Sequence, residues 1–199
     1  MKRKLPPQFH QDADVVAIGA SAGGIDALFA LLEGLPADYP LPLIVVLHLP
    51  EGHDSQLAEL FGRRLGRPVQ EAQAHAPVEP GILYFAPPGY HLLVDPDRTF
   101  SLSCDPPVLH SRPSIDVLLE SCADAYGERA VAMVLTGANQ DGAHGLRCIR
   151  EAGGLALVQD PAEAAYPTMP KAAIEAATPD FVLPLAGLHS VLMRLGNRP

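Results

Sequence analysis

Ser21 lies in the part of the sequence that most directly indicates chemistry. Residues 15–24 (VVAIGASAGG) form an apolar, β-branched run that ends in a serine flanked by glycines. Apolar residues then recur at helical spacing, at Ile25, Leu28, Phe29, Leu32 and Leu35. Ser21 is therefore predicted on a sharp turn from a strand into a helix. The pattern Gly-x-Ser-x-Gly is typical of a nucleophile elbow, and the start of the helix would offer N–H groups to a developing oxyanion.

The same turn has a second interpretation, in which it only closes an α/β unit or cradles a phosphate. Against a nucleotide site, Ser21 stands where the second glycine of G-x-G-x-x-G would be, and no Gly-Lys-Ser/Thr follows. On this motif alone, nucleophile and structural turn remain equal alternatives.

Two further polar residues follow predicted strands. His48 comes directly after the apolar run 43–47, and Asp141 lies in the loop 136–142 that follows the run 130–135. Because ligands of open parallel sheets bind beyond the carboxyl ends of the strands, Ser21, His48 and Asp141 are predicted at one rim. There His48 could remove the Ser21 proton while Asp141 orients and balances the imidazole.

Other candidates fit this rim less well. The remaining histidines lie in the predicted tail, in loops, in a hairpin region or within helices. Asp160 precedes Pro161 and is predicted to be a turn residue, and Asp116 is expected to face solvent or to cap the start of the helix predicted at 114–126. For His48 the alternative is a partly buried histidine satisfied by a backbone carbonyl. No H-E-x-x-H motif or Cys/His cluster occurs, so no metal or other cofactor is predicted.

Strand-like and helix-like segments alternate along the chain, which predicts an α/β fold with a doubly wound, mostly parallel sheet in a Rossmann-like three-layer arrangement. The predicted strands are 15–19, 43–47, 68–72, 131–135, 155–159 and 181–183, and the predicted helices are 24–34, 54–65, 114–126, 142–152, 170–177 and 187–195. Residues 82–85, 91–94 and 99–103 are separated by proline-containing turns, which predicts a small antiparallel hairpin or meander at a sheet edge.

Composition limits the class of protein. The chain has 199 residues, 48% of them hydrophobic, which fits one domain at 15–199 after a flexible N-terminal tail at 1–14. A net charge of −9 argues against nucleic acid as the main partner. Three scattered cysteines favour a reduced, cytoplasmic protein. Neither a signal peptide nor a membrane-inserting segment is recognisable, and the oligomeric state is left open.

Several separate segments resemble, in order, the catalytic domain of the CheB family of chemotaxis protein-glutamate methylesterases. They are IGASAGG (18–24), HLP (48–50), YFAPPGYHL (84–92), SRPSID (111–116), LTG (135–137) with DG (141–142), and MP (169–170). The resemblance extends over about residues 15–182. It places Ser21, His48 and Asp141 on the family's nucleophile, base and orienting acid, in an order that differs from that of α/β-hydrolases.

The resemblance implies hydrolysis of glutamate γ-methyl esters in chemoreceptors through an acyl-enzyme, with deamidation of receptor glutamines as a related activity. The chain departs from the family at Ala22, where many members have threonine, at Ala138, where many have methionine, and at Asn139, where glycine is usual. The last two flank the expected oxyanion region. Asn139 is expected to take a positive φ there, because asparagine tolerates that conformation best after glycine.

Two other functions remain alternatives. One is a catalytically weak or inactive CheB-like module that binds partners in a signalling complex, and the other is an esterase for an unrelated small ester, which a deep pocket would favour. Family members commonly carry an N-terminal receiver domain, whereas 14 residues precede the first predicted strand here. Control by phosphorylation within this chain is therefore not expected.

Overall fold

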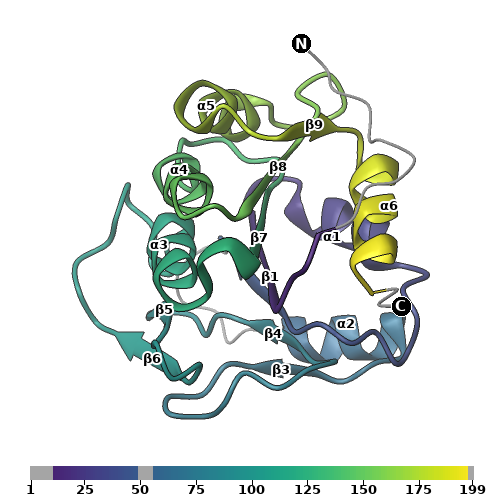
Figure 1. The fold of residues 1–199 in the computed structure, drawn as a ribbon, viewed down its shortest axis with the longest axis vertical. Coiled ribbons are helices and arrows are strands. Elements are labelled where there is room, and N and C mark those ends of the chain that lie inside the picture. The colour runs from purple at the N-terminus through teal and green to yellow at the C-terminus, as the bar shows by residue number, and fades with distance from the viewer. Residues whose placement is uncertain (1–10, 49–55, 197–199) are drawn as a thin grey trace.

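The computed structural model describes residues 11–48 and 56–196. Most of the predicted tail, and the first two residues of the helix predicted at 54–65, lie outside these ranges. Seven parallel strands form one sheet in the order β3-β4-β2-β1-β7-β8-β9 (Figure 1). The strands are β1 (Val15–Ala20), β2 (Leu43–Leu47), β3 (Val69–Glu71), β4 (Leu83–Phe85), β7 (Ala130–Val134), β8 (Leu155–Gln159) and β9 (Phe181–Leu183).

Helices cover both faces of this sheet, so the predicted three-layer α/β architecture is confirmed (Figure 1). One face carries α1 (Gly24–Leu32), α2 (Leu57–Leu65) and α6 (Leu185–Gly196). The other carries α3 (Ile115–Tyr126), α4 (Ala143–Glu151) and α5 (Thr168–Ala177), with a 3-10 turn, η1 (Gly127–Arg129), after α3. No helix within the described ranges is long and apolar enough to cross a bilayer.

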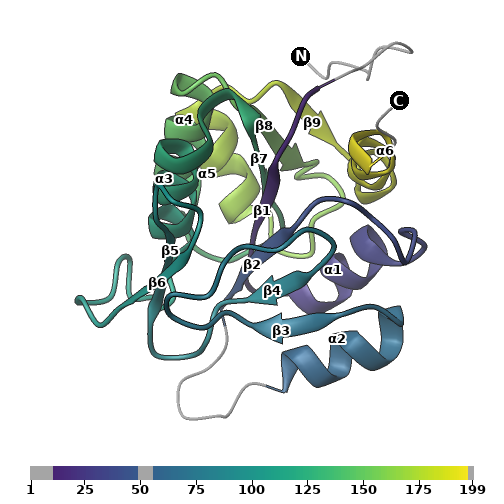
Figure 2. The ribbon, with the colours of Figure 1, turned by 60° about the horizontal axis from the view of Figure 1, so that its bottom comes forward.

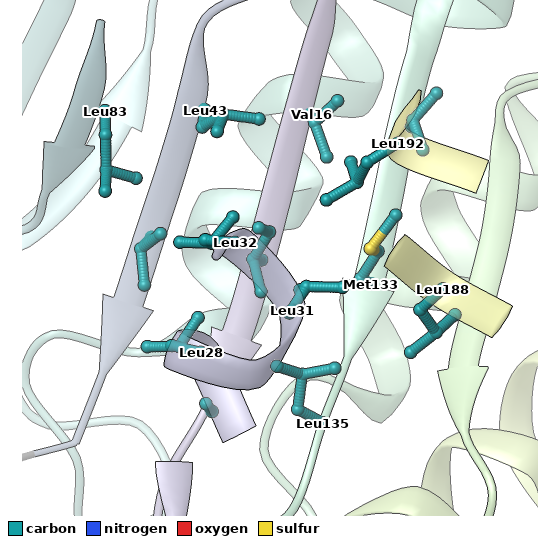
Figure 3. Packing of buried hydrophobic residues seen from close by; sticks show 14 of the residues in the cluster. Val16, Leu28, Leu31, Leu32, Leu43, Leu83, Met133, Leu135, Leu188 and Leu192 are labelled. Carbon is teal, nitrogen blue, oxygen red and sulfur yellow. The ribbon is translucent and has the colours of Figure 1, made fainter. Parts of the chain in front are cut away.

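The central strand β1 is buried along its whole length. Val16 and Ile18 belong to the core that includes α1 and α6, whereas Val15 and Ala17 belong to the core on the α3 side. Figure 3 shows Val16 among side chains of α1, β7 and α6. A parallel strand covered on both faces is expected to be apolar throughout, which explains the unbroken run in the sequence.

Glycines let the start of α3 approach the centre of the sheet closely. A Cβ on Gly19, near the end of β1, would collide with Cγ2 of Ile115, the first residue of α3. A Cβ on Gly142 would lie 2.7 Å from the same methyl group, and Gly142 also has a φ of +89°. Ile115 therefore occupies space that two glycines leave open, which brings the α3 N-terminus against the carboxyl ends of β1 and β7.

The antiparallel part is smaller than the sequence suggested. The strands β5 (His91–Val94) and β6 (Phe100–Ser103) form a separate antiparallel pair, as predicted (Figure 2). The assignment of residues 82–85 to that antiparallel group is wrong, because β4 pairs in parallel with β2 and β3. All three residues of β4 are buried, and a short apolar run carries no information about strand direction.

The order of the strands creates a crevice beside β1. From β1 the chain leads to β2 on one side, and after β6 and α3 it returns to β7 on the other side of β1. The connections that leave β1 and β7 thus diverge, which is the arrangement that opens a binding site in doubly wound sheets. Ser21 follows β1, and the loop that contains Asp141 follows β7.

Candidate functional site

Ser21 occupies the predicted turn between β1 and α1. Its N–H donates to the carbonyl oxygen of Thr136 at 3.0 Å, and its own carbonyl accepts the N–H of Gly24 at 2.8 Å. Gly23, the N-cap of α1, has a φ of +75°, a conformation that favours glycine. The predicted strand–turn–helix around the serine is therefore present, with Ser21 partly exposed.

Thr136, which follows β7, fixes this turn and was not singled out from the sequence. Its hydroxyl donates to the carbonyl oxygen of Ala22 at 2.9 Å and accepts the N–H of Tyr166 at 2.9 Å. Its N–H donates to Oε1 of Gln159 at 2.8 Å. The sequence offers two signals for this role, a threonine placed after a buried strand and its position in the LTG segment (135–137) of the family resemblance. The hydrogen bonds of Thr136 thus connect the turn at Ser21 to the end of β7 and to the loop before α5.

His48 pairs with Asp141 at the same rim. The Nε2 atom of His48 lies 2.9 Å from Oδ2 of Asp141, although 93 positions separate the two residues. The His48 side chain is 11% exposed and that of Asp141 is fully buried. The backbone-carbonyl alternative considered for His48 is wrong, since its ring partner is a carboxylate.

The N-terminus of α3 surrounds the Asp141 carboxylate. Besides His48, its oxygens accept the Ser114 hydroxyl at 2.8 Å and the N–H groups of Ile115 at 2.7 Å, Asp116 at 3.0 Å and Gly142 at 3.0 Å. Burial acts to raise the pKa of Asp141, but the hydrogen bonds from His48, the α3 N–H groups and Ser114 outweigh it and hold the pKa below its usual value. Asp141 is therefore ionised at neutral pH.

An ionised Asp141 determines which nitrogen of His48 is basic. The carboxylate accepts from Nε2–H, so Nδ1 carries the lone pair. The Nδ1 atom lies 3.4 Å from the hydroxyl of Ser111. Within the described residues, the Ser21 side chain makes no hydrogen bond, yet Ser21 and His48 line one pocket of about 330 Å³ together with Leu47 and the first residues of α1. Hydrogen bonds to a catalytic base are often formed only when substrate binds.

Asp116 is buried, so the expectation that it faces solvent is wrong. The residue is 6% exposed, and its Oδ1 accepts the N–H of Gly145 in the first turn of α4 at 2.7 Å. Burial is the main cause that raises the pKa of Asp116, to about 6, and the neighbouring Asp141 carboxylate adds to this shift. The expected cap at the start of its own helix is also wrong, since Ser114 caps α3 and Asp116 instead caps the start of α4.

Asn139 does not have the positive φ expected from the sequence. Its side-chain Oδ1 instead accepts the N–H of Asp141 at 3.2 Å, two residues along the chain. Asparagine is well suited to such a local turn because its short amide mimics a backbone carbonyl. The hydrogen bond of the Asn139 side chain, rather than tolerance of a positive φ, therefore explains why asparagine fits in this loop.

Two of the other candidate residues, Asp160 and His91, have structural hydrogen-bond partners. Oδ1 of Asp160 accepts the N–H of Ala162 at 3.0 Å, which confirms the predicted turn. The buried His91 ring lies between the N–H of Ser114 and the carbonyl oxygen of Pro106. Within residues 11–48 and 56–196, no three His, Cys, Asp or Glu side chains are grouped so that they could hold a metal ion.

Comparisons with known proteins show the family of the chain. The model of the family described as CheB methylesterase matches residues 16–192. A protein of Leptospira interrogans, provisionally named protein-glutamate methylesterase/protein-glutamine glutaminase, is 41% identical over 182 residues, which cover 92% of this chain and 94% of the relative. A protein-glutamate methylesterase/protein-glutamine glutaminase of Anaeromyxobacter dehalogenans is 40% identical over 98% of this chain, which spans 57% of that longer relative.

The fold has a counterpart among solved structures. The crystal structure of the Thermotoga maritima CheB methylesterase catalytic domain superimposes with a TM-score of 0.86 at 31% sequence identity. The alignment covers 92% of this chain and 99% of that domain. The family match and the structural superposition both cover nearly all of the described residues. The chain therefore belongs to the CheB methylesterase family.

Proposed function

We propose that this chain is a protein-glutamate methylesterase that hydrolyses glutamate γ-methyl esters of chemoreceptors and deamidates receptor glutamines. The family and the names of the relatives support this activity. The observation that carries the proposal is the pairing of His48 with the buried Asp141 at 2.9 Å, beside a pocket that His48 shares with Ser21. A serine, a basic imidazole and an orienting carboxylate are the groups that acyl transfer through a covalent intermediate needs.

In the proposed reaction, Ser21 Oγ attacks the ester carbonyl carbon while Nδ1 of His48 takes the hydroxyl proton. Asp141 holds Nε2–H and stabilises the imidazolium. The tetrahedral intermediate collapses as the imidazolium returns the proton to the methoxy oxygen, so methanol leaves and an acyl-serine remains. Water, deprotonated by Nδ1, then attacks the acyl carbon, and glutamate is released as Ser21 regains its proton.

Backbone N–H groups beside Ser21 are suited to stabilise the oxyanion. The N–H of Ser21 is already bonded to Thr136. The N–H groups of Ala22 and Gly23 make no hydrogen bond within the described residues and lie at the N-terminal end of α1. The residue after the nucleophile is the usual donor in a serine elbow. Because these donors belong to the backbone, alanine at position 22 in place of threonine leaves them unchanged.

The domain limits and the cellular location are part of the same proposal. We infer that residues 15–199 form the catalytic domain, since β1 begins at Val15 and the family match covers residues 16–192. Cys104, Cys122 and Cys148 are all free thiols, which supports a reducing compartment such as the cytoplasm. The partner is then the cytoplasmic part of a chemoreceptor.

The test is release of labelled methanol from receptors whose glutamates carry tritiated methyl esters. We expect release by the wild-type chain and none above background by Ser21→Ala, together with fluorophosphonate labelling that maps to Ser21. Labelling of Ser21 without methanol release would instead favour an esterase for another ester. If neither occurs, the chain is a non-catalytic binding module.

A further inference from the structure

Among the described residues, Ser111 is the one whose side chain contacts the basic nitrogen of His48. Its Oγ lies 3.4 Å from Nδ1, while Asp141 occupies Nε2. The Ser21 hydroxyl makes no hydrogen bond within the described residues, so the proposed nucleophile does not orient the ring here. Neither the family match nor the names of the relatives assign a role to Ser111.

A tight turn with an unfavourable backbone conformation presents Ser111 to His48. Val108 and Ser111 exchange two backbone hydrogen bonds, at 3.1 and 2.8 Å, around the two central residues Leu109 and His110. Both central residues have positive φ, 48° and 66°, although neither is glycine. Such conformations cost free energy, persist only where the surroundings enforce them and cluster at functional sites.

The next residues anchor the same segment. The guanidinium of Arg112 donates to the carbonyl oxygens of Cys104 at 2.9 Å and Asp105 at 3.1 Å, which joins the two ends of the loop between β6 and α3. Ser114 then donates its hydroxyl to Asp141. One short segment, 111–116, therefore contacts both the basic side of His48 and the carboxylate behind it.

We propose that Ser111 is a positioning residue that holds the His48 imidazole with Nδ1 directed toward the Ser21 pocket. Its hydroxyl donates to Nδ1 while the ring is neutral, and the same oxygen can accept from Nδ1–H when the ring is protonated. Ser111 thus orients the ring in both states without taking the proton from it. At 3.4 Å the contact is long, so Ser21 can compete for Nδ1 once substrate is bound. This inference rests on the proposed function of the Ser21 site.

The test compares Ser111→Ala with Ser111→Thr, which keeps the hydroxyl, and with Ser103→Ala as the matched control. Ser103 belongs to the neighbouring strand β6, and within the part of the chain that the structure describes its hydroxyl forms hydrogen bonds only with Asp105. We expect Ser111→Ala to lower kcat about three- to tenfold, the effect of one weak hydrogen bond, with KM changed less than about twofold. The kcat of Ser111→Thr and of Ser103→Ala should stay near the wild-type value. The wild type and the three variants should all melt at similar temperatures.

Two measurements that need no receptor separate this inference from the proposed function. The rate at which a fluorophosphonate labels Ser21 should fall in Ser111→Ala by the same factor as kcat. The ¹⁵N shift of His48 Nδ1 should move toward that of a nitrogen without a hydrogen bond. If Ser111→Ala labels at the wild-type rate, or if Ser111→Thr is as impaired as Ser111→Ala, the positioning role is overturned. A wild-type chain that is labelled at Ser21 but releases no methanol would refute the proposed substrate and leave the test of Ser111 intact.

Discussion

Asp116 and Asp141 cap each other's helices. Asp141, which lies two residues before α4, accepts the N–H groups of Ile115 and of Asp116 itself at the start of α3, at 2.7 and 3.0 Å. Asp116, in the first turn of α3, accepts the N–H of Gly145 in the first turn of α4 at 2.7 Å. For the ionised Asp141, this position satisfies free donors at the α3 N-terminus and interacts favourably with the helix dipole. The acid that orients His48 is therefore fixed by the packing of two helix ends.

The pH dependence of stability should report on Asp116. The pKa of Asp116 is raised from 3.8 to about 6 in the folded chain, so folding favours its protonated form. This contribution to the free energy of unfolding is fully present below about pH 4 and is lost as the pH rises through about 6. Asp116→Asn keeps an oxygen for Gly145 and carries no charge. We expect the variant to match the wild-type melting temperature near pH 4 and to exceed it above about pH 7.

The control for this prediction is Asp38→Asn, because Asp38 is an exposed carboxylate. The change in melting temperature of this control at each pH is subtracted from that of Asp116→Asn. Thermal melts in a series of buffers from about pH 4 to 8 give the comparison. A constant difference in melting temperature between Asp116→Asn and wild type across this range would contradict a raised pKa of Asp116.

Ser21 and His48 should behave as one catalytic unit. Each single alanine substitution should reduce receptor demethylation by roughly three orders of magnitude or more, and the double variant should be hardly slower than either single variant. Ser21→Ala should change the free energy of unfolding by less than about 1 kcal/mol, because its hydroxyl makes no hydrogen bond within the described residues. Losses that multiply in the double variant would contradict a shared step.

Asn139→Gly should weaken the loop that carries Asp141. The substitution removes the acceptor of the Asp141 N–H and adds backbone freedom, so we expect a loss of about 1 kcal/mol in unfolding free energy and a lower kcat. Gln140→Gly, at an exposed position in the same loop, adds similar freedom and serves as the control. Chemical denaturation and demethylation rates give the readouts. A fully stable and active Asn139→Gly would mean that the side-chain contact contributes nothing.

Gly19→Ala should destabilise the junction between β1 and α3. The added methyl group would collide with Ile115, and overpacking of this kind costs about 1–3 kcal/mol. Gly62→Ala is the matched control, since Gly62 lies within α2 and the nearest atom to an added Cβ is 3.9 Å away. That control should be neutral or stabilising, because alanine favours helices over glycine by about 1 kcal/mol. Urea unfolding of both variants measures these changes in stability. Equal unfolding midpoints for Gly19→Ala and Gly62→Ala would refute the predicted destabilisation at Gly19.

The sequence was sufficient for the architecture and for the rim at which the candidate residues gather. The β1, β2 and β7 strands are unbroken apolar runs, and β8 is apolar up to its last residue, Gln159. Turns follow these strands and helices alternate with them, so their burial is encoded locally. Parallel strands direct their carboxyl ends to one edge of the sheet. That rule alone placed Ser21, His48 and Asp141 at the same edge.

The tertiary structure decided which atoms meet at that edge. The contact of His48 with Ser111 joins residues 63 positions apart, and the contact of Asp141 with Ser114 joins residues 27 positions apart. The burial of Asp116, the parallel direction of β4 and the side-chain role of Asn139 likewise follow from how separate elements pack. Local patterns of hydrophobicity record whether a residue is buried. They do not record the partner of a polar group, because hydrogen bonds across the fold depend on register and helix placement that only the assembled core sets.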